Sequence, residues 1–387
     1  MVEAYIVDAV RTAGGRRNGR LSKKHPADLG GIVIDALLER TNIDPAAVDD
    51  VIFGCVSQIG PQTFNLARTS IMSSNLPESV PGVTIDRQCG SSQQAIHFAA
   101  QAIMSGTQDL VIAGGVEVMS QVPIGSPMTK VPDLGTPFAG LISKRYPDEQ
   151  FSQFSGAEKM AAKYGVSREE LAKFAYASHV NGAAATKAGK FKDEIVPISV
   201  DIDGQEVLHD SDEGIRWEPD YDSMLNLAPL QEGGVISAAF ASQICDGAAA
   251  VLVASAAAVK KYNLKPIARV HSMAVVGSDP TMVLEGPIPA TEKVLEKAGL
   301  TIADIDLYEV NEAFGSVPLA WAKAVGADLS KLNVNGGAQA LGHPLGATGA
   351  KLAGTLLHEL RRRGGRYGLL TICEGLGTAN ATIFELL

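Results

Sequence analysis

The stretch Ile43-Asp44-Pro45-Ala46-Ala47-Val48-Asp49 recurs 257 positions later as Leu300-Thr301-Ile302-Ala303-Asp304-Ile305-Asp306. Each copy lies between an amphipathic helical pattern and an apolar, strand-like run. Helices that alternate with strands are typical of βαβ units and parallel sheets. Any two βαβ units look somewhat alike, but a match at single residues favours two related α/β halves packed about a pseudo-twofold axis. The strand-to-helix loops of the two halves could then face one cleft.

The same alternation runs through both outer thirds of the chain. We expect strands at 5–10, 51–56, 110–114, 267–276, 307–310, 369–373 and 381–386. We expect helices at 27–40, 91–105, 289–298 and 347–363. The middle, from about 120 to 244, is richer in Pro, Phe and charge. There we expect helices at 155–164 and 168–189 and a hairpin turn at Asp203-Gly204. An insertion over two such halves is where a substrate-binding lid lies.

Composition argues against several classes of protein. A chain of 387 residues is long enough for two or three domains. Its 33 Lys and Arg against 43 Asp and Glu leave a net charge of −10, which argues against nucleic-acid binding. The most apolar stretch, 248–259, is too short to span a bilayer, and the N-terminus lacks the pattern of a signal peptide. The four cysteines form neither a CxxC nor a zinc-type cluster. We therefore expect no metal site, no membrane association and a reducing, cytoplasmic location.

Cys89 is a candidate nucleophile. It lies in Asp86-Arg87-Gln88-Cys89-Gly90-Ser91-Ser92, between a strand-like segment and a helix. A thiol at that place meets the positive end of the helix dipole, so we expect a lowered pKa and more thiolate. The small residues that follow let a substrate approach the backbone. The alternative is a buried core cysteine.

His343 lies in a glycine-rich stretch, Asn335-Gly336-Gly337 through Gly342-His343-Pro344 to Gly349. Glycines are costly to order, so we expect this backbone to approach a ligand closely. The stretch matches neither GxGxxG nor the P-loop pattern. We therefore interpret His343 as a functional residue, the alternative being a histidine that caps a helix.

Two further polar residues follow buried strands. Cys373 ends the run Leu369–Ile372 and precedes the glycine-rich Glu374-Gly375-Leu376-Gly377. A thiol there could exchange a proton with a substrate, or be an ordinary core cysteine. Asn311, which follows the strand at 307–310, could cap a helix or hold a water molecule.

Six motifs in this order resemble the thiolase family of acyl-CoA acyltransferases, over essentially the whole chain. They are Gln88-Cys89-Gly90-Ser91, 114–120, 246–250, Asn311-Glu312-Ala313-Phe314, 335–344 and Cys373-Glu374-Gly375. The resemblance implies an α/β fold in which two βαβαβαββ halves form a layered α-β-α-β-α core with an inserted loop domain. We place the N-terminal half at 1–119 plus 245–264. The loop domain, which forms the lid and binds CoA, takes 120–244, and the C-terminal half takes 265–387.

The resemblance also assigns roles. Cys89 is the nucleophile that takes an acyl group as a thioester, and His343 accepts its proton. Cys373 moves a proton to or from the α-carbon of the second acyl-CoA. Asn311 holds a water in one oxyanion hole with His343, and the backbone N–H groups of Cys89 and Gly375 form the other. The reaction is thiolysis of a 3-ketoacyl-CoA by CoA, or condensation of two acyl-CoAs, with ping-pong kinetics.

Coenzyme A is implied as a substrate, and no other cofactor is. In the loop domain, Arg216 matches the residue for the nucleotide end of CoA, and Ser242 lies near the pantetheine. Ser223 is a weaker candidate. The alternative for Arg216 is a solvated surface charge. A homodimer is the expected assembly, with a homotetramer as the other possibility.

Three departures from the family pattern concern the substrate. Leu376 stands where many members have glycine, Gln153-Phe154 stands where short-chain members commonly have a Met-Gly pair in the lid, and Val283-Leu284 replaces a second such pair. They favour a medium, long or bulky 3-ketoacyl group over an acetoacetyl-CoA-only substrate, although Leu and Phe could simply refill the same pocket.

Two other functions are compatible with this fold. A ketoacyl synthase usually pairs its cysteine with two histidines, whereas this chain offers one histidine in a glycine-rich loop and a second cysteine. A non-catalytic acyl-CoA-binding protein would have lost a catalytic residue, yet all four are present.

Overall fold

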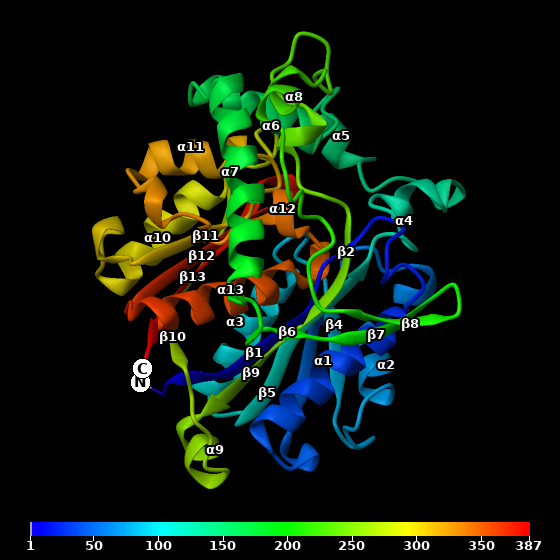
Figure 1. The fold of residues 1–387 in the computed structure, drawn as a ribbon, viewed down its shortest axis with the longest axis vertical. Helices are drawn as coiled ribbons and strands as arrows, with labels where there is room; N and C mark the ends of the chain where they lie inside the picture. The colour runs from blue at the N-terminus through cyan, green and yellow to red at the C-terminus, as the bar shows by residue number, and fades with distance from the viewer. Residues whose placement is uncertain (1) are drawn as a thin grey trace.

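Strands from both halves of the chain join in one mixed sheet (Figure 1). The computed structural model describes residues 2–387. The strand order is β11-β12-β13-β10-β1-β9-β5-β3-β4, with β2 and β6 paired beside that path. The N-terminal strands are β1 (Ala4–Thr12), β2 (Gly15–Arg16), β3 (Asp50–Gly54), β4 (Gly82–Ile85), β5 (Leu110–Val118), β6 (Ile195–Val196) and β9 (Cys245–Ser255). The C-terminal strands are β10 (Ala268–Gly277), β11 (Leu307–Val310), β12 (Tyr367–Glu374) and β13 (Thr378–Leu386).

The sheet is not purely parallel. The βαβ pattern correctly predicts that β3 is parallel to β4 and β5, and β11 to β12. However, β9 and β13 run antiparallel to their neighbours. The three-residue turn Gly375–Gly377 between β12 and β13 shows why. Such a short link can join only antiparallel strands, because a parallel pair needs a long crossover.

The internal repeat extends from sequence to structure. The stretches at 43–49 and 300–306 each contain a single 3₁₀ turn, Pro45–Ala47 and Ile302–Asp304, again 257 positions apart. The same spacing separates the first residues of β3 and β11, of α3 and α13, and of β5 and β12. The duplication of the α/β halves is therefore confirmed.

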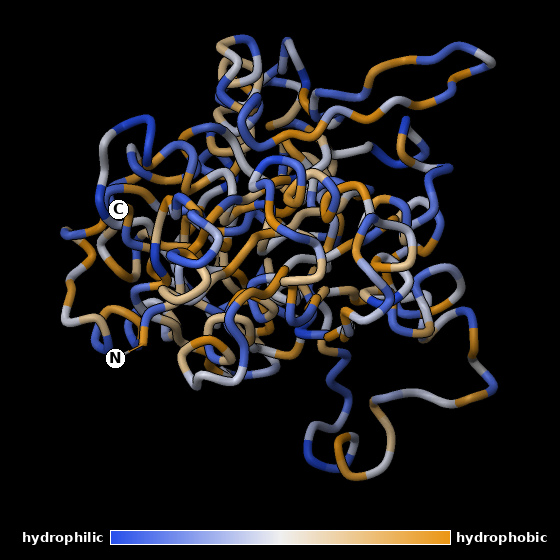
Figure 2. The backbone as a smooth tube through the Cα atoms, turned by 90° about the horizontal axis from the view of Figure 1, so that it is seen from below, coloured by the Kyte–Doolittle hydropathy of each residue, from blue (hydrophilic) through white to orange (hydrophobic). Residues whose placement is uncertain are grey.

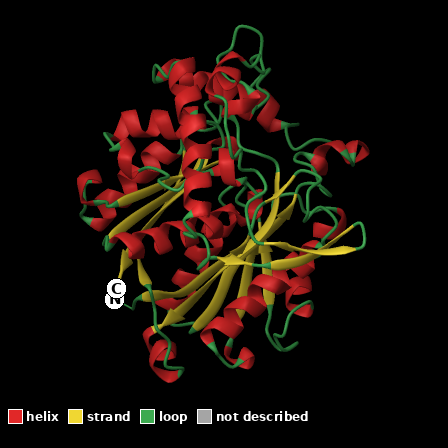
Figure 3. Cartoon of the chain, viewed as in Figure 1, coloured by secondary structure: helices red, strands yellow, loops and turns green. Residues whose placement is uncertain are grey.

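Helices form three layers around the strands (Figure 3). One outer layer consists of α1 (Pro26–Thr41) and α2 (Leu66–Met72), which cover the outer face of the N-terminal strands. The other outer layer consists of α10 (Pro287–Ala298), which covers the outer face of the C-terminal strands, and α11 (Ser316–Val325), which packs on α10. The central layer is α3 (Ser91–Met104) and α13 (Thr348–Arg363), which pack on one another and on strands of both halves. The strands meet through a short β1–β10 pairing, Tyr5 with Arg269 and Ile6 with Ala268.

The middle of the chain contributes the expected insertion. Its helices are α4 (Ser126–Thr129), α5 (Leu141–Arg145), α6 (Gln153–Lys163), α7 (Arg168–Lys187) and α8 (Tyr221–Asn226). The hairpin of β7 (Ile198–Ile202) and β8 (Gln205–His209) turns at Asp203-Gly204, as predicted, with both residues at positive φ. Two short helices elsewhere complete the set, α9 (Ala256–Lys261) and α12 (Ala338–Leu341).

Figure 2 shows long loops that extend away from a centre where apolar segments gather. Within residues 2–387, no helix is both long enough and apolar enough to cross a membrane.

Candidate active site

Three of the four predicted catalytic residues lie at or just beyond the end of a strand, and the fourth lies in a loop between two helices. Cys89 lies in the turn between β4 and α3, and His343 in the loop between α12 and α13. Asn311 directly follows β11, and Cys373 is next to last in β12. Because β11 and β12 are parallel neighbours, Asn311 and Cys373 share one edge of the sheet, where the Asn311 N–H donates to Thr371 at 3.1 Å. The carboxyl ends of parallel strands are the usual place for ligands in such folds.

A strained turn presents Cys89. The preceding residue, Gln88, has a φ of 48°, a left-handed conformation that is uncommon for residues other than glycine. The Asp86 carboxylate accepts from the Gln88 N–H at 2.7 Å, and the Ser91 hydroxyl donates to the Gln88 carbonyl at 2.6 Å. Within residues 2–387, the Cys89 N–H donates to no protein acceptor. That N–H is available to a ligand.

The glycines around His343 bring protein segments together. A Cβ atom at Gly349 would lie 2.1 Å from the Gln93 backbone nitrogen on α3, and one at Gly346 would lie 2.6 Å from the Gly54 carbonyl oxygen. The Ala350 N–H donates to the Ser92 hydroxyl at 3.0 Å. The first turn of α13 and the first turn of α3 are thus interlocked, and Gly346 in the preceding loop lies against the end of β3. The expectation that these glycines serve a ligand is wrong for these positions, because the close neighbour is the chain itself.

The hydrogen bonds of His343 determine its tautomer. Its Nδ1 lies 2.6 Å from the Thr348 hydroxyl, and that hydroxyl donates its single proton to the Pro344 carbonyl at 2.9 Å. The hydroxyl must therefore accept from Nδ1–H. Nε2 then carries the lone pair and accepts from the Asn311 side-chain amide at 3.3 Å. His343 is oriented as a base through Nε2.

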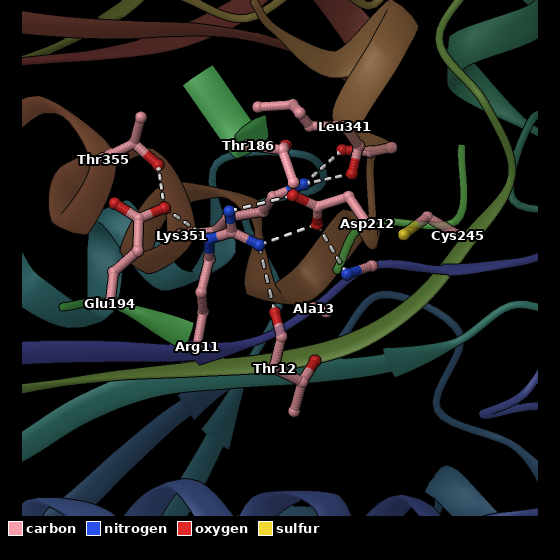
Figure 4. A network of polar contacts seen from close by, with 12 residues as sticks. Arg11, Thr12, Ala13, Thr186, Glu194, Asp212, Cys245, Leu341, Lys351 and Thr355 are labelled. Carbon is pink, nitrogen blue, oxygen red and sulfur yellow. Dashed lines mark hydrogen bonds and ion pairs between the residues drawn. The ribbon is translucent and has the colours of Figure 1, made fainter. Parts of the chain in front are cut away.

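A buried cation supports the His343 loop (Figure 4). Lys351 of α13 donates to the carbonyls of Leu341 and Gly342, at 2.5 and 2.8 Å. Burial and, to a lesser extent, the Lys351 charge lower the pKa of His343 to about 3. The imidazole is therefore neutral at physiological pH.

The same region ties the insertion to the N-terminal half. Arg11 on β1 is buried and pairs with Glu194 at 2.6 Å and with Asp212 at 2.7 Å (Figure 4). Asp212 also accepts from the Gly14 N–H at 2.7 Å. This network anchors the chain shortly before Arg216.

The expected lowering of the Cys89 pKa is wrong for the free protein. Burial raises the pKa of the Cys89 thiol well above its usual value, and Cys373, Glu374 and Glu117 raise it further. Burial also raises the pKa of Cys373 to about 12. The positive end of the α3 dipole does not offset the free-energy cost of removing the Cys89 thiolate from water. The resting site therefore pairs a neutral thiol with a neutral imidazole.

Two places can bind an oxyanion. Gly375 lies beside the Cys89 turn, because a Cβ atom there would lie 3.0 Å from Oε1 of Gln88. In the described chain the N–H of Gly375, like that of Cys89, donates to no protein acceptor. The second place is beside His343, where Oδ1 of Asn311 is buried and has no partner within residues 2–387. A water bound there would satisfy this oxygen.

The predicted CoA contacts are spread over the insertion. Ser242 lies close to the catalytic loops, since its N–H donates to the Ala313 carbonyl at 2.9 Å. Arg216 is exposed, and its N–H donates to Nδ1 of His179 at 3.1 Å. Ser223 is also exposed, but its hydroxyl donates to Asp220, the N-cap of α8, at 2.6 Å. The Arg216 side chain is thus exposed to solvent and Ser242 lies near the catalytic loops, whereas the Ser223 hydroxyl already has a partner.

Three supporting residues were missed by sequence reasoning. Thr348 sets the tautomer of His343, Lys351 holds the loop carbonyls, and the Gln243 carbonyl accepts from the His343 N–H at 3.2 Å. Thr348 and Lys351 are in the first turns of α13, close to the histidine in sequence. A search for polar residues there would have found them, whereas nothing in the sequence marks Gln243.

Comparisons with known proteins agree with this geometry. A model of the thiolase N-terminal domain matches residues 4–257, and one of the thiolase C-terminal domain matches residues 264–386. A steroid 3-ketoacyl-CoA thiolase of Mycobacterium tuberculosis is 55% identical, over 100% of this chain and 95% of that protein. The 3-ketoacyl-CoA thiolases of Erwinia tasmaniensis and Bacillus subtilis are 42% and 40% identical, each over 100% of both chains.

Proposed function

The chain belongs to the thiolase family and is an acyl-CoA acyltransferase, and we propose that it cleaves a 3-ketoacyl-CoA with free CoA through an acyl-Cys89 intermediate. The observation that carries this proposal is the convergence of three loops. The Gly375 loop contacts Gln88 in the Cys89 turn, and the helix that follows Cys89 is hydrogen-bonded to the helix that follows His343, from Ala350 to Ser92. The His343 imidazole has its Nε2 free of a proton.

In the first step, Cys89 sulfur attacks the 3-keto carbon. The Cys89 proton passes to Nε2 of His343 as the C–S bond forms. The bond between C2 and C3 then breaks, and the electron pair goes to C2 of the leaving acetyl-CoA. Cys373 donates its proton to that carbon. Its raised pKa suits this role, because a thiol that holds its proton can serve as the acid.

In the second step, the sulfur of free CoA attacks the acyl-Cys89 thioester. The Cys373 thiolate takes the proton of the CoA thiol, and the Cys89 thiolate leaves and regains its proton from Nε2 of His343. The product is an acyl-CoA shortened by two carbons, and the site returns to its starting state. Negative charge develops on a carbonyl oxygen in both steps. The N–H groups of Cys89 and Gly375 serve one oxyanion, and His343 with a water on Asn311 serves the other. Loss of one such donor typically costs about 2.7–4 kcal/mol in the transition state.

We propose that CoA enters as a substrate and that no further cofactor takes part, since the side chains of Cys89, His343 and Cys373 move every proton in this scheme and backbone N–H groups stabilise the oxyanion. The adenine-nucleotide end would lie at Arg216, whose neighbour Trp217 is exposed and has Lys187 at 5.8 Å over its ring. Ser242 would contact the pantetheine. Ser223 is a weaker contact, because Asp220 competes for its hydroxyl.

We further propose a bulky acyl group, of the kind in the name of the 55% identical relative. Apolar side chains support this. Leu376 in the catalytic loop is 42% exposed, and Phe154 of α6 is 43% exposed with its ring 5.6 Å from that of Phe314. The buried Val283-Leu284 segment packs against Gly156 of α6. A short-chain acetoacetyl-CoA thiolase is the alternative, distinguished by thiolysis rates across acyl lengths and a steroid-type substrate.

A homodimer is the assembly that we propose, a homotetramer being a pair of such dimers. Strand β4 ends the path of the sheet, and its Val83 is 43% exposed. An open strand edge with an apolar side chain favours pairing with another chain. Light scattering over a range of concentrations tests this, and a monomer at micromolar concentration would contradict it. A cytoplasmic location fits two adjacent thiols that must both stay reduced.

The nucleophile is tested by acyl labelling. Mixed with a 3-ketoacyl-CoA without free CoA, the wild-type protein should gain one acyl group on the peptide that contains Cys89. Cys89→Ala should gain none, and Cys55→Ala, which removes a buried thiol outside the scheme, should label normally. Acylation of the Cys89→Ala protein at the wild-type level would refute the proposal.

A further inference from the structure

Glu374 is a buried acid beside the nucleophile that the proposed reaction does not use. It is the last residue of β12, and it has no exposed surface. A Cβ atom at Gly90 would lie 1.8 Å from Oε1 of Glu374. The carboxyl group thus rests against the backbone of the residue that follows Cys89. Within residues 2–387, neither of its oxygens has a hydrogen-bond partner.

The internal duplication provides a reference for this carboxyl group. Glu117, on β5, stands 257 positions before Glu374, just as Cys89 stands 257 positions before Gly346. Both oxygens of Glu117 accept hydrogen bonds of 2.9–3.1 Å, from the N–H groups of Val56, Ser57 and Gly346 and from the side-chain amide of Gln62. In one half, therefore, a carboxylate engages the Gly346 N–H. In the other half, the equivalent N–H belongs to Cys89 and has no protein acceptor in the described chain.

The two environments differ in their hydrogen-bond donors. Burial raises the pKa of Glu117 too, but its four hydrogen bonds stabilise the ionised form and offset part of that shift. No hydrogen bond of normal geometry reaches the buried Glu374 carboxyl group, and an unsolvated carboxylate in such a place is far more costly than the neutral acid. In agreement, burial raises the pKa of Glu374 to about 8, while the nearby Thr378 hydroxyl, the Arg87 charge and the Asn380 N–H lower it by less.

The groups that face this carboxyl come from three segments. Arg87 and Asp86 lie in the turn before Cys89, Cys89 itself lies above it, and Cys373 precedes it on β12. Of these, Arg87 alone is a cation. A negative charge on Glu374 would therefore oppose a negative charge on either sulfur.

We propose that Glu374 is a positioning residue for acylation, held as a neutral acid beneath Gly90 so that the Cys89 N–H stays free for an oxyanion and no charge opposes the Cys89 thiolate. This inference rests on the proposed role of Cys89 as nucleophile. The direction of its pH dependence follows from the geometry. Below about pH 8 Glu374 is neutral, and above it the carboxylate holds back thiolate formation at Cys89.

The experiment measures alkylation of Cys89 by iodoacetamide, read by peptide mass spectrometry from about pH 6.5 to 9.5 on the full chain. For Glu374→Gln, the logarithm of the rate should rise in a straight line with pH, because no carboxyl titrates beside the thiol. For the wild-type protein the line should bend downward near pH 8. The variant should then react at least about threefold faster at pH 9.5 and within about twofold of the wild type at pH 6.5.

Glu117→Gln is the matched control, since an amide cannot accept from four donors. At pH 6.5 it should melt well below the wild type, whereas Glu374→Gln should melt within a few degrees of it. Superimposable alkylation profiles, or equal losses of melting temperature in the two variants, would overturn the proposal. If Glu374→Gln does not fold, the alkylation profile of Glu374→Leu is compared with that of the wild type. A bend near pH 8 in the wild-type profile that is absent from the variant supports the proposal, and a wild-type profile without a bend overturns it.

The readout also separates this proposal from the proposed function. Alkylation reports on the Cys89 sulfur whether or not an acyl group is ever transferred to it. If acyl labelling fails but the wild-type alkylation profile bends near pH 8, the nucleophilic role of Cys89 is refuted while the electrostatic effect of Glu374 on its sulfur is supported. Normal acyl labelling with superimposable profiles would refute the role of Glu374 alone.

Discussion

The Thr348 hydroxyl offers the most direct test of how this site makes a base. It accepts from Nδ1 of His343 at 2.6 Å and donates to the Pro344 carbonyl at 2.9 Å. Thr348→Val keeps the shape of the side chain and removes both hydrogen bonds. The buried Nδ1–H then has no acceptor, and the tautomer with the proton on Nε2 becomes competitive.

The size of the effect follows from the cost of an unpaired buried donor, about 1–3 kcal/mol. At 1.36 kcal/mol per tenfold change, the equilibrium ratio of the Nδ1–H to the Nε2–H tautomer of His343 should fall by about 5- to 150-fold. The rate of Cys89 acylation should fall by up to that factor, because the Nε2 proton prevents transfer from the thiol. Thr348→Ser retains the hydroxyl and should stay within a few-fold of the wild type.

The assay is rapid-quench formation of the acyl-enzyme at saturating 3-ketoacyl-CoA. Thermal melting run in parallel identifies any loss of folded protein. A folded Thr348→Val protein that acylates at the wild-type rate would refute the tautomer assignment. Equal losses in the Val and Ser variants would show that packing rather than the hydroxyl matters.

Three other expectations concern buried charge and pH. Arg11→Met leaves Glu194 and Asp212 buried without their ion-pair partner and should lower the free energy of unfolding in urea by about 3–5 kcal/mol. Lys323→Met, at the more exposed pair with Glu170, should cost less than about 1 kcal/mol. Similar losses in the two variants would contradict this expectation. Hydrogen bonds from Asn335 and Arg363 hold the pKa of Glu359 at about 2, so its stabilising effect is complete above the unfolded value of 4.5 and is lost as pH falls toward 2. Melting temperatures of the wild type and Glu359→Gln should therefore converge between about pH 5 and pH 3, and a constant gap would count against the ion pairs. Because the pKa of His343 is about 3, protonation of the imidazole should not lower the rate of Cys89 acylation between about pH 7 and 5. A fall in this rate with a midpoint near pH 6.5 would show that the ring is solvated.

Local patterns predicted most of the fold. The repeat at 43–49 and 300–306 revealed the duplication because each copy carries the same short-range signals for a turn and a strand. The positions of Cys89 and Asn311 after strands followed from periodicity for the same reason. The sequence could not show that β9 runs antiparallel to β1 and β5, because those partners are distant along the chain. For β12 and β13 the short link Gly375–Gly377 does require an antiparallel pair, and the interpretation as a parallel sheet overlooked it.

The site divides in the same way. From the sequence alone came the candidate catalytic residues, which are two thiols, one imidazole and one amide, each singled out by its neighbours along the chain. Only the tertiary structure decided their states, because burial, donors and charges come from segments hundreds of residues away. It made the Cys89 thiol a weaker acid than the helix alone predicts, and it placed the lone pair of His343 on Nε2. It also gave the two related acids, Glu117 and Glu374, opposite surroundings, since four donors converge on one and none on the other.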